Sequence, residues 1–262
     1  MSYLNSKKIA CQKVGIDFCL IQLSDSITRD VLIERIRNLN SQDTVDSILV
    51  QLPLPSHLSS DLSMIISTID PSKDVDGLTP TSLGKFYDSK YDSKYDSFCI
   101  PCTPQGIMEL LNAYGIGVSG KDVVIVGRSS IVGKPLSHLM MEQDATVTVC
   151  HSKTQNLFEH TRRADLVVSA IGKANFFGKN DFKQGAVVID VGINRDSSNK
   201  LCGDVRFNEL ENCSSISPVP GGVGPMTVLC LVKNIIKLAE IHAPKMLNKT
   251  HVVKFNNARL MK

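Results

Sequence analysis

Tryptophan is absent from this sequence, and aromatic residues make up only 5% of its 262 residues. No apolar run is long enough to cross a membrane, and no basic cluster is interleaved with aromatic residues. The formal net charge is a small +3, spread along the chain. We therefore expect no membrane span and no nucleic-acid partner. Because 42% of the residues are hydrophobic, the chain can bury a sizeable core, as one large or two ordinary domains.

A charged and apolar leader is also missing, because the sequence passes almost directly into a helical pattern. The eight cysteines lie mostly in apolar strand-like or helical surroundings, which indicates free thiols in a reducing compartment. We expect no metal site and, by default, a cytoplasmic location.

The stretch from Lys121 to Thr154 has the pattern of a strand, a glycine turn, a helix and a second strand. The β-branched run Asp122–Val126 suits a strand buried on both faces of a parallel sheet, and the small-residue turn Gly127–Gly133 follows it. A helix is expected from Pro135 to about Gln143, and a strand from Ala145 to Cys150. Such a βαβ unit places its turn to receive phosphate.

The glycine turn departs from the common G-x-G-x-x-G pattern, because Ser129 takes the middle glycine position. Arg128 lies beside it, and Ser152 follows the second strand, where a nucleotide-binding unit addresses the ribose. Arginine and serine suit a 2′-phosphate, so the residues favour NADP over NAD. The alternative is that they are ordinary turn and helix-start residues.

Two further apolar runs, Ala164–Ile171 and Ala186–Val191, each end at a glycine, and this repetition predicts a doubly wound parallel sheet. The segment Pro218–Thr227 has three glycines between prolines. We expect it to form neither helix nor central strand but a rigid backbone track that a flat ligand approaches closely. A helix from Thr227 to about Ile241 should follow.

The part of the chain before residue 104 is expected to alternate strands and helices. Tyr3 and Lys7 are four residues apart in a predicted helix, so they share one of its faces. Gln51 is a polar residue near the end of an apolar run, where a functional amide or a hydrogen-bonded core glutamine would be found. The predicted helices are Tyr3–Val14, Thr28–Asn40 (with Val31, Leu32, Ile36 and Leu39 on one side) and Asp61–Ile69, and the predicted strands are Asp17–Leu23 and Ser47–Leu54.

Two acids, Asp74 and Asp76, flank a valine just before Gly77. A calcium loop would need further oxygen ligands that the segment lacks, so we expect one carboxylate to anchor a ligand through paired N–H donors. The repeat YDSKYDSKYDS at Tyr87–Ser97 is predicted to be a mobile insertion without catalytic content. Phe98–Pro104 is predicted to be an extended linker between domains, with a helix from Gln105 to Tyr114 after it.

Taken together, these segments resemble the bifunctional methylenetetrahydrofolate dehydrogenase and methenyltetrahydrofolate cyclohydrolase family. The matching pieces follow the family's order: YLNSK at Tyr3–Lys7, VQLPLP at Val50–Pro55, KDVDG at Lys73–Gly77, PCTPQG at Pro101–Gly106, VGRSSIVGKP at Val126–Pro135, CHSKT at Cys150–Thr154, DVGIN at Asp190–Asn194, GDV at Gly203–Val205 and PVPGGVGPMT at Pro218–Thr227.

The resemblance implies two α/β domains, the second Rossmann-like with a doubly wound parallel sheet, and a cleft between them. It places a folate-binding catalytic domain at residues 1–103, with helix 227–241 packed back on it, an NADP-binding domain at 104–226 and a tail at 242–262. It implies NADP-dependent oxidation of 5,10-methylenetetrahydrofolate and hydrolysis of the methenyl product to 10-formyltetrahydrofolate, by a homodimer.

Residue roles follow from the same resemblance. Lys7 is the acid/base group, Tyr3 packs on the folate, Gln51 hydrogen-bonds and tunes the lysine, and Asp76 holds the pterin. A lowered lysine pKa, which such catalysis needs near neutral pH, would come from partial burial beside a neutral amide. The other implied contacts are with the substrate (Val50, Leu52, Pro220, Gly221, Gly222, Val223 and Gly224) and with NADP (Gly127, Arg128, Ser129, Gly133, Ser152 and Ile193).

Family members usually carry a further helix and strand before the segment that matches Tyr3–Lys7, and the printed sequence does not contain them. One alternative is therefore a truncated member that binds folate or NADP with impaired catalysis. Another is a two-domain NADP dehydrogenase of shikimate type, which Lys7, Gln51 and Asp76 argue against.

Overall fold

The computed structural model describes residues 3–88, 98–210 and 215–243. The chain divides into two compact units. The first unit consists of residues 1–102 and 231–262, and the second of residues 103–230. Among the described residues, no helix is long and apolar enough to cross a membrane.

The first unit is built from helices joined by extended segments. Its elements are α1 (Tyr3–Lys13), α2 (Arg29–Asn40), the 3-10 turn η1 (Ser56–Asp61), α3 (Leu62–Ser67), the 3-10 turn η2 (Pro71–Lys73), α4 (Pro80–Asp88) and the part of α9 (Val223–His242) that begins at Leu231. Thr28 caps α2, because its side chain accepts a hydrogen bond from the Val31 backbone N–H. The helix therefore begins where the sequence predicts.

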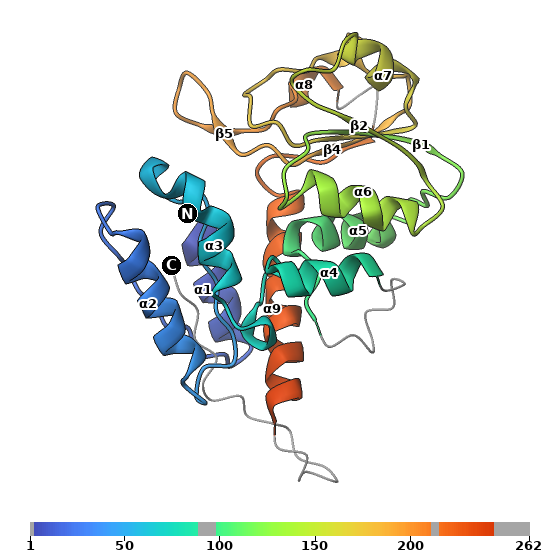
Figure 1. The fold of residues 1–262 in the computed structure, drawn as a ribbon. Helices are drawn as coiled ribbons and strands as arrows, with labels where there is room; N and C mark the ends of the chain where they lie inside the picture. Colours follow the sequence, from blue (N-terminus) through green and yellow to red (C-terminus); the bar gives the residue numbers. More distant parts are fainter. Residues whose placement is uncertain (1–2, 89–97, 211–214, 244–262) are drawn as a thin grey trace. The chain divides into compact units, whose positions relative to one another are not determined.

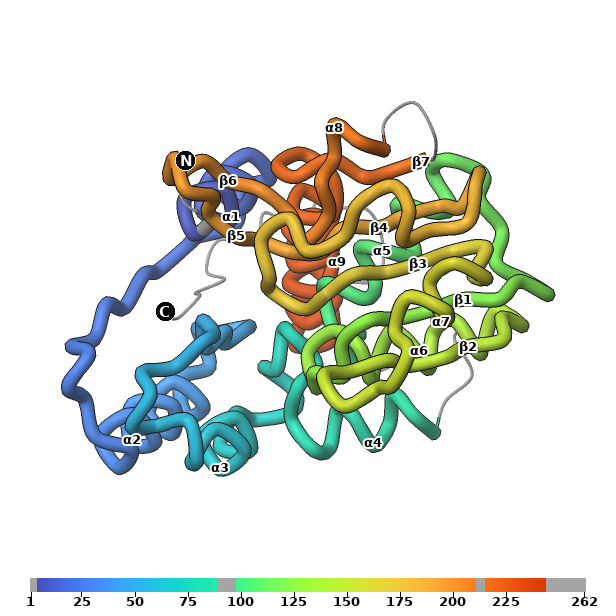
Figure 2. Tube along the Cα trace, turned by 90° about the horizontal axis from the view of Figure 1, so that it is seen from above, coloured from blue at the N-terminus to red at the C-terminus, as the bar shows by residue number. Residues whose placement is uncertain are grey.

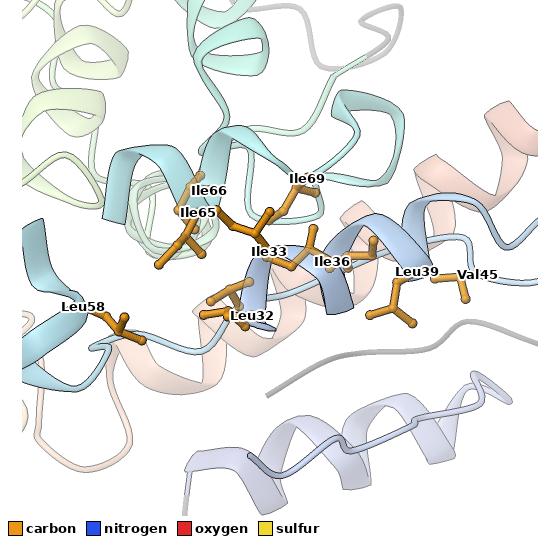
Figure 3. Close-up of a cluster of buried hydrophobic side chains, with 11 residues drawn as sticks. Leu32, Ile33, Ile36, Leu39, Val45, Leu58, Ile65, Ile66 and Ile69 are labelled. Atoms are coloured by element: carbon orange, nitrogen blue, oxygen red, sulfur yellow. The ribbon is translucent and has the colours of Figure 1, made fainter. Parts of the chain in front are cut away.

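Aliphatic side chains of α2 and α3 form the core of this unit (Figure 3). Leu32, Ile33 and Ile36 of α2 lie against Ile65 and Ile66 of α3. The buried face of α2 is rotated from the predicted one, because Val31 is 47% exposed whereas Ile33 is buried.

The two strands predicted in this unit are wrong in detail. Residues 17–24 are extended but unpaired in a ladder, and within residues 3–88 the β-pairing is a single isolated bridge between Ile48 and Asp74. Ser47–Leu54 still buries Ile48 and Val50, whereas in the first segment Ile21 and Leu23 are only partly buried against the same core. A strand also needs a neighbour along its length, and no described segment runs beside Ser47–Leu54 for more than this bridge.

The second unit holds a five-stranded parallel sheet in the order β2-β1-β3-β4-β7 (Figure 2). Helices α5 and α6 lie on one face and α7 and α8 on the other (Figure 1), which confirms the doubly wound prediction. The elements are α5 (Cys102–Ala113), β1 (Asp122–Val126), α6 (Gly133–Met141), β2 (Thr146–Cys150), α7 (Leu157–Arg163), β3 (Leu166–Ser169), the 3-10 turn η3 (Lys179–Asp181), β4 (Val187–Asp190), the hairpin β5 (Asn194–Arg195) with β6 (Leu201–Cys202), α8 (Phe207–Leu210) and β7 (Ser215–Ile216).

Two boundaries differ from the predictions. Helix α9 begins at Val223, inside the segment predicted to exclude helix. Gly224 and Pro225 occupy its first turn, where a proline is tolerated because the N–H that it lacks has no intrahelical acceptor there. For the same reason Pro104 lies inside the first turn of α5. Tyr87 and Asp88 end α4, whereas residues 89–97 of the YDSK repeat and residues 244–262 of the tail lie outside the described residues.

Candidate active site and cofactor site

A buried lysine lies at the centre of the candidate site in the first unit. Lys7 is on α1, only 6% of it is exposed, and its Nζ donates a hydrogen bond of 2.9 Å to Oε1 of Gln51. The Gln51 Nε2 donates to the Leu52 carbonyl at 2.9 Å, which orients the amide so that its oxygen faces the lysine. The structure thus joins two predicted site residues that are far apart in the sequence.

The electrostatics of Lys7 follow from this position. Burial lowers the pKa of Lys7, because the ammonium loses water, and the nearby Asp76, Cys102 and Cys11 oppose that shift. The amide of Gln51 is neutral, so this hydrogen bond does not add a counter-charge to the lysine. The lowered pKa agrees with the expectation for a lysine that exchanges protons near neutral pH.

Asp76 is the second charged group of this cluster. Burial raises the pKa of Asp76, while Lys7 and a hydrogen bond from the Cys102 thiol lower it. Cys102 was not predicted as a site residue. It stands in C-x-x-C spacing with Cys99, but both are free, buried thiols.

The neighbours of Asp76 have structural tasks. Lys73 Nζ donates to the carbonyls of Asn40 at 2.7 Å and Gln42 at 2.8 Å, at the C-terminal end of α2. Asp74 is 1% exposed and accepts from the Thr79 backbone N–H at 2.7 Å, just before α4. Of the two acids in this segment, Asp74 therefore accepts hydrogen bonds from the backbone, and Asp76 is the one whose charge acts on Lys7.

The remaining predicted residues of this unit are less informative. Tyr3 is the first residue of α1, and its side chain lies outside the described residues. Val50 is buried in the hydrophobic core, and Leu52 is partly buried against the same cluster.

The glycine turn in the second unit is tightly closed. A Cβ at Gly133 would collide with the carbonyl of Gly127, so the turn fits only glycine there. Ser129 stabilises the start of α6, because its hydroxyl accepts from the Val132 N–H at 3.2 Å and its carbonyl from the Lys134 N–H at 3.0 Å. The turn and the first turn of α6 are therefore held together by their own backbone, and α6 begins directly at the glycine turn, as in a phosphate-binding unit.

The other residues predicted to contact NADP are exposed in this unit. Arg128 lies in the turn, and Ser152 follows β2. Ile193 follows β4 and is 63% exposed in this unit. In the predicted track, Pro220 and Gly221 are exposed, whereas Gly222 and Val223 are buried and a Cβ at Gly224 would meet nothing within 4 Å.

Two aspartates that sequence reasoning did not select lock the loops at the carboxyl ends of β3 and β4. The Asp190 carboxylate accepts from the backbone N–H groups of Gly192 at 2.9 Å, Asp204 at 3.0 Å and Val205 at 2.8 Å. The Asp204 carboxylate accepts in turn from the Ser169 hydroxyl, the Ile171 and Lys173 N–H groups and the Asn194 amide. The hydrogen bonds of these two aspartates together fix the loop that carries Ile193.

The burial of Asp190 leads to a prediction of how the free energy of unfolding depends on pH. Burial raises the pKa of Asp190 from 3.8 to about 6, against the three N–H donors that lower it. The folded state then holds the Asp190 proton more tightly than the unfolded state does. The free energy of unfolding therefore falls as the pH rises from the unfolded pKa of 3.8 through the folded pKa of about 6. Relative to the Asp190→Asn variant, the wild-type free energy of unfolding should fall by about 2 kcal/mol from about pH 4 to about pH 7. Urea denaturation across this range tests it, and a constant difference would contradict it.

Comparison with known proteins identifies both units. Residues 1–76 match the family model of the tetrahydrofolate dehydrogenase/cyclohydrolase catalytic domain, and residues 101–243 match that of the NAD(P)-binding domain of the same enzymes. The chain is 50% identical over 242 residues to the bifunctional protein FolD of Acetivibrio thermocellus, covering 92% of this chain and 82% of that one. It is 49% identical over 240 residues to the FolD of Bacillus subtilis, covering 91% and 82%.

Solved structures agree. The FolD methylenetetrahydrofolate dehydrogenase/cyclohydrolase of Campylobacter jejuni has a TM-score of 0.84 at 45% identity, over 91% of this chain and 83% of that one. The Trypanosoma brucei enzyme, complexed with NADP cofactor and inhibitor, has a TM-score of 0.84 at 37% identity, over 91% and 82%. The chain therefore belongs to the tetrahydrofolate dehydrogenase/cyclohydrolase family.

Proposed function

We propose that this chain oxidises 5,10-methylenetetrahydrofolate with NADP and hydrolyses the resulting methenyl compound to 10-formyltetrahydrofolate. The observation that carries the proposal is the buried Lys7, hydrogen-bonded to Gln51 and flanked by Asp76, in a chain whose relatives are bifunctional enzymes of this kind.

For hydrolysis, Lys7 acts as the acid/base group. Because burial lowers the pKa of Lys7, its ammonium gives up a proton more readily than a lysine in water does, as an acid/base group requires. The amine takes a proton from water as the water oxygen bonds to the methenyl carbon. The ammonium then returns a proton to the ring nitrogen as the carbon–nitrogen bond to it breaks, and the added hydroxyl group loses its proton to become the formyl carbonyl, so that one proton is released overall. Gln51 holds Nζ in place, and Asp76 accepts N–H donors of the pterin, with Tyr3, Val50 and Leu52 beside the folate.

For oxidation, NADP supplies the hydride acceptor when bound. The second unit fits this cofactor, because the space that a Cβ at Gly133 would fill is closed by backbone and α6 begins at the turn. Gly127, Ser129 and Gly133 would hold the diphosphate, Arg128 and Ser152 the 2′-phosphate, and Ile193 the nicotinamide. Pro220, Gly221, Gly222, Val223 and Gly224 would line the folate side, and the open space at Gly224 supports close approach of a flat ligand.

Turnover of purified protein tests the function. We expect a methenyl absorbance signal from 5,10-methylenetetrahydrofolate that appears faster with NADP than with NAD, and an enzyme-dependent decay of that signal. A folded chain that binds NADP but produces no signal would contradict the proposal, and turnover of shikimate instead would replace it.

We also propose that the chain is a homodimer and acts in the cytoplasm. The dimer is implied by the family resemblance, and the location agrees with the free thiols among the described cysteines. Sedimentation of the purified chain at micromolar concentration tests the dimer, and fractionation of cells that produce it tests the location.

A further inference from the structure

Helix α9 carries one buried polar side chain in the part that belongs to the first unit. Asn234 is 3% exposed, and the residues around it on the same face, Leu231, Ile235 and Leu238, are apolar and buried. A buried carboxamide costs free energy unless it is hydrogen-bonded, so its partners indicate its task.

The partners of Asn234 are backbone carbonyls from two distant segments. Its Nδ2 donates to the Val75 carbonyl at 2.9 Å and to the Ile100 carbonyl at 3.0 Å, so both of its hydrogens are used. The Cys102 sulfur lies 3.5 Å from the same nitrogen and 3.8 Å from the Val75 carbonyl. One side chain thus holds the segment before Asp76 and the segment before Cys102 at one point.

Those two segments carry the groups that lie around Lys7. Asp76 directly follows Val75, and Cys102 lies two residues after Ile100; both lie near enough to Lys7 to act on its pKa. The residues that Asn234 holds are shielded from solvent, because Val75 is fully buried and Ile100 is 3% exposed. Water therefore has no access to replace the two hydrogen bonds if the amide is removed.

We propose that Asn234 is a positioning residue that sets the placement of Asp76 and Cys102 relative to Lys7. The proposal rests on the proposed function, since its consequence is catalytic. Asn234 touches no substrate in this role; it acts through the backbone of the two segments that it holds. A displacement of Asp76 by a fraction of an ångström would weaken both the pterin contact and the electrostatic setting of Lys7.

The chain offers a matched control for the test. Asn40 on α2 forms a similar bridge in the same unit, because its Nδ2 donates to the Thr68 carbonyl at 2.7 Å and its Oδ1 accepts from the Asp70 N–H at 3.0 Å. Asn234→Leu and Asn40→Leu each remove a carboxamide of similar size and leave two backbone groups unpaired. We expect both to lower stability, Asn40→Leu by less because Asn40 is only partly buried.

The kinetics should separate the two variants. For hydrolysis of 5,10-methenyltetrahydrofolate, Asn234→Leu should lower kcat about tenfold or more and raise KM, while the Kd for NADP stays unchanged. Asn40→Leu should leave kcat and KM within about twofold of wild type. If Asn234→Leu does not fold, Asn234→Ser, which keeps one donor, replaces it with the same expected direction.

The outcomes are distinct. Equal kinetic effects of the two leucine variants, or a folded Asn234 variant with wild-type kcat and KM, would overturn the positioning role. Absence of turnover by the wild-type chain would instead overturn the proposed function.

Discussion

Lys7→Ala should abolish hydrolysis of 5,10-methenyltetrahydrofolate and leave NADP binding intact. Removal of a positioned acid/base group costs about 10²- to 10⁴-fold in rate, so we expect kcat to fall by at least about 100-fold. The Kd for NADP should stay at the wild-type value, because Gly127–Gly133 belongs to the other unit. Stopped-flow decay of the methenyl absorbance measures the first quantity, and calorimetric titration with NADP measures the second.

A matched control lies next to Lys7 on the same helix. Lys8 is exposed, whereas Lys7 is buried, so Lys8→Ala removes the same chemical group from the opposite environment. We expect Lys8→Ala to keep the wild-type rate. Equal losses in the two variants would mean that α1 tolerates neither change structurally. If Lys7→Ala loses NADP affinity as well as hydrolysis, the assignment of Lys7 as the acid/base group is contradicted.

Most of the parallel sheet could be predicted from the sequence, because the residues of a buried strand form an apolar run that can be recognised without knowing its neighbours. Val123–Val126 and Leu166–Ser169 are short apolar runs buried on both faces, and a turn or glycine follows each. Their pairing order then follows from the fold class. β7 was missed because its two residues, Ser215 and Ile216, pair with β4 without an apolar run to mark them.

In the first unit, an apolar run did not predict a paired strand. Ser47–Leu54 looks like a strand because it must bury Ile48 and Val50, and the structure buries both. Burial of side chains does not require a ladder, however, and the ladder depends on what lies alongside. That information is non-local, so the apolar pattern could predict the core but not the pairing.

The site residues divide in a similar way. Lys7 and Gln51 were predicted through family resemblance, and their hydrogen bond is observed. Asn234 carries no such signal, because an asparagine in an apolar helix face has the same pattern whether it bridges a loop or only caps a carbonyl. Asp190 had a weak signal, an acid at the end of a buried strand, but its three N–H donors come from loops that sequence alone does not bring together.

The second large effect is expected from one methyl group in the glycine turn. In Gly133→Ala the added Cβ would occupy the position of the Gly127 carbonyl, which is backbone and cannot rotate away. The turn must then open, and opening it moves the N–H groups at the start of α6 away from the diphosphate. Because the Lys134 N–H already donates to Ser129 and Pro135 has none, we count only one or two such charge-assisted hydrogen bonds. Their loss, at about 1.5–3 kcal/mol each, predicts a rise of at least about tenfold in the Kd for NADP.

Gly117→Ala is the control for this variant, because Gly117 lies in the same unit and a Cβ there would meet nothing within 4 Å. We expect it to bind NADP as the wild type does. The hydrolysis of 5,10-methenyltetrahydrofolate gives a second readout, since Lys7 and its partners belong to the other unit. Gly133→Ala should therefore lose oxidation and keep hydrolysis, whereas Lys7→Ala should lose hydrolysis and keep NADP binding. If Gly133→Ala retains wild-type affinity for NADP, the turn is not the diphosphate site, and the cofactor must be held elsewhere in the second unit.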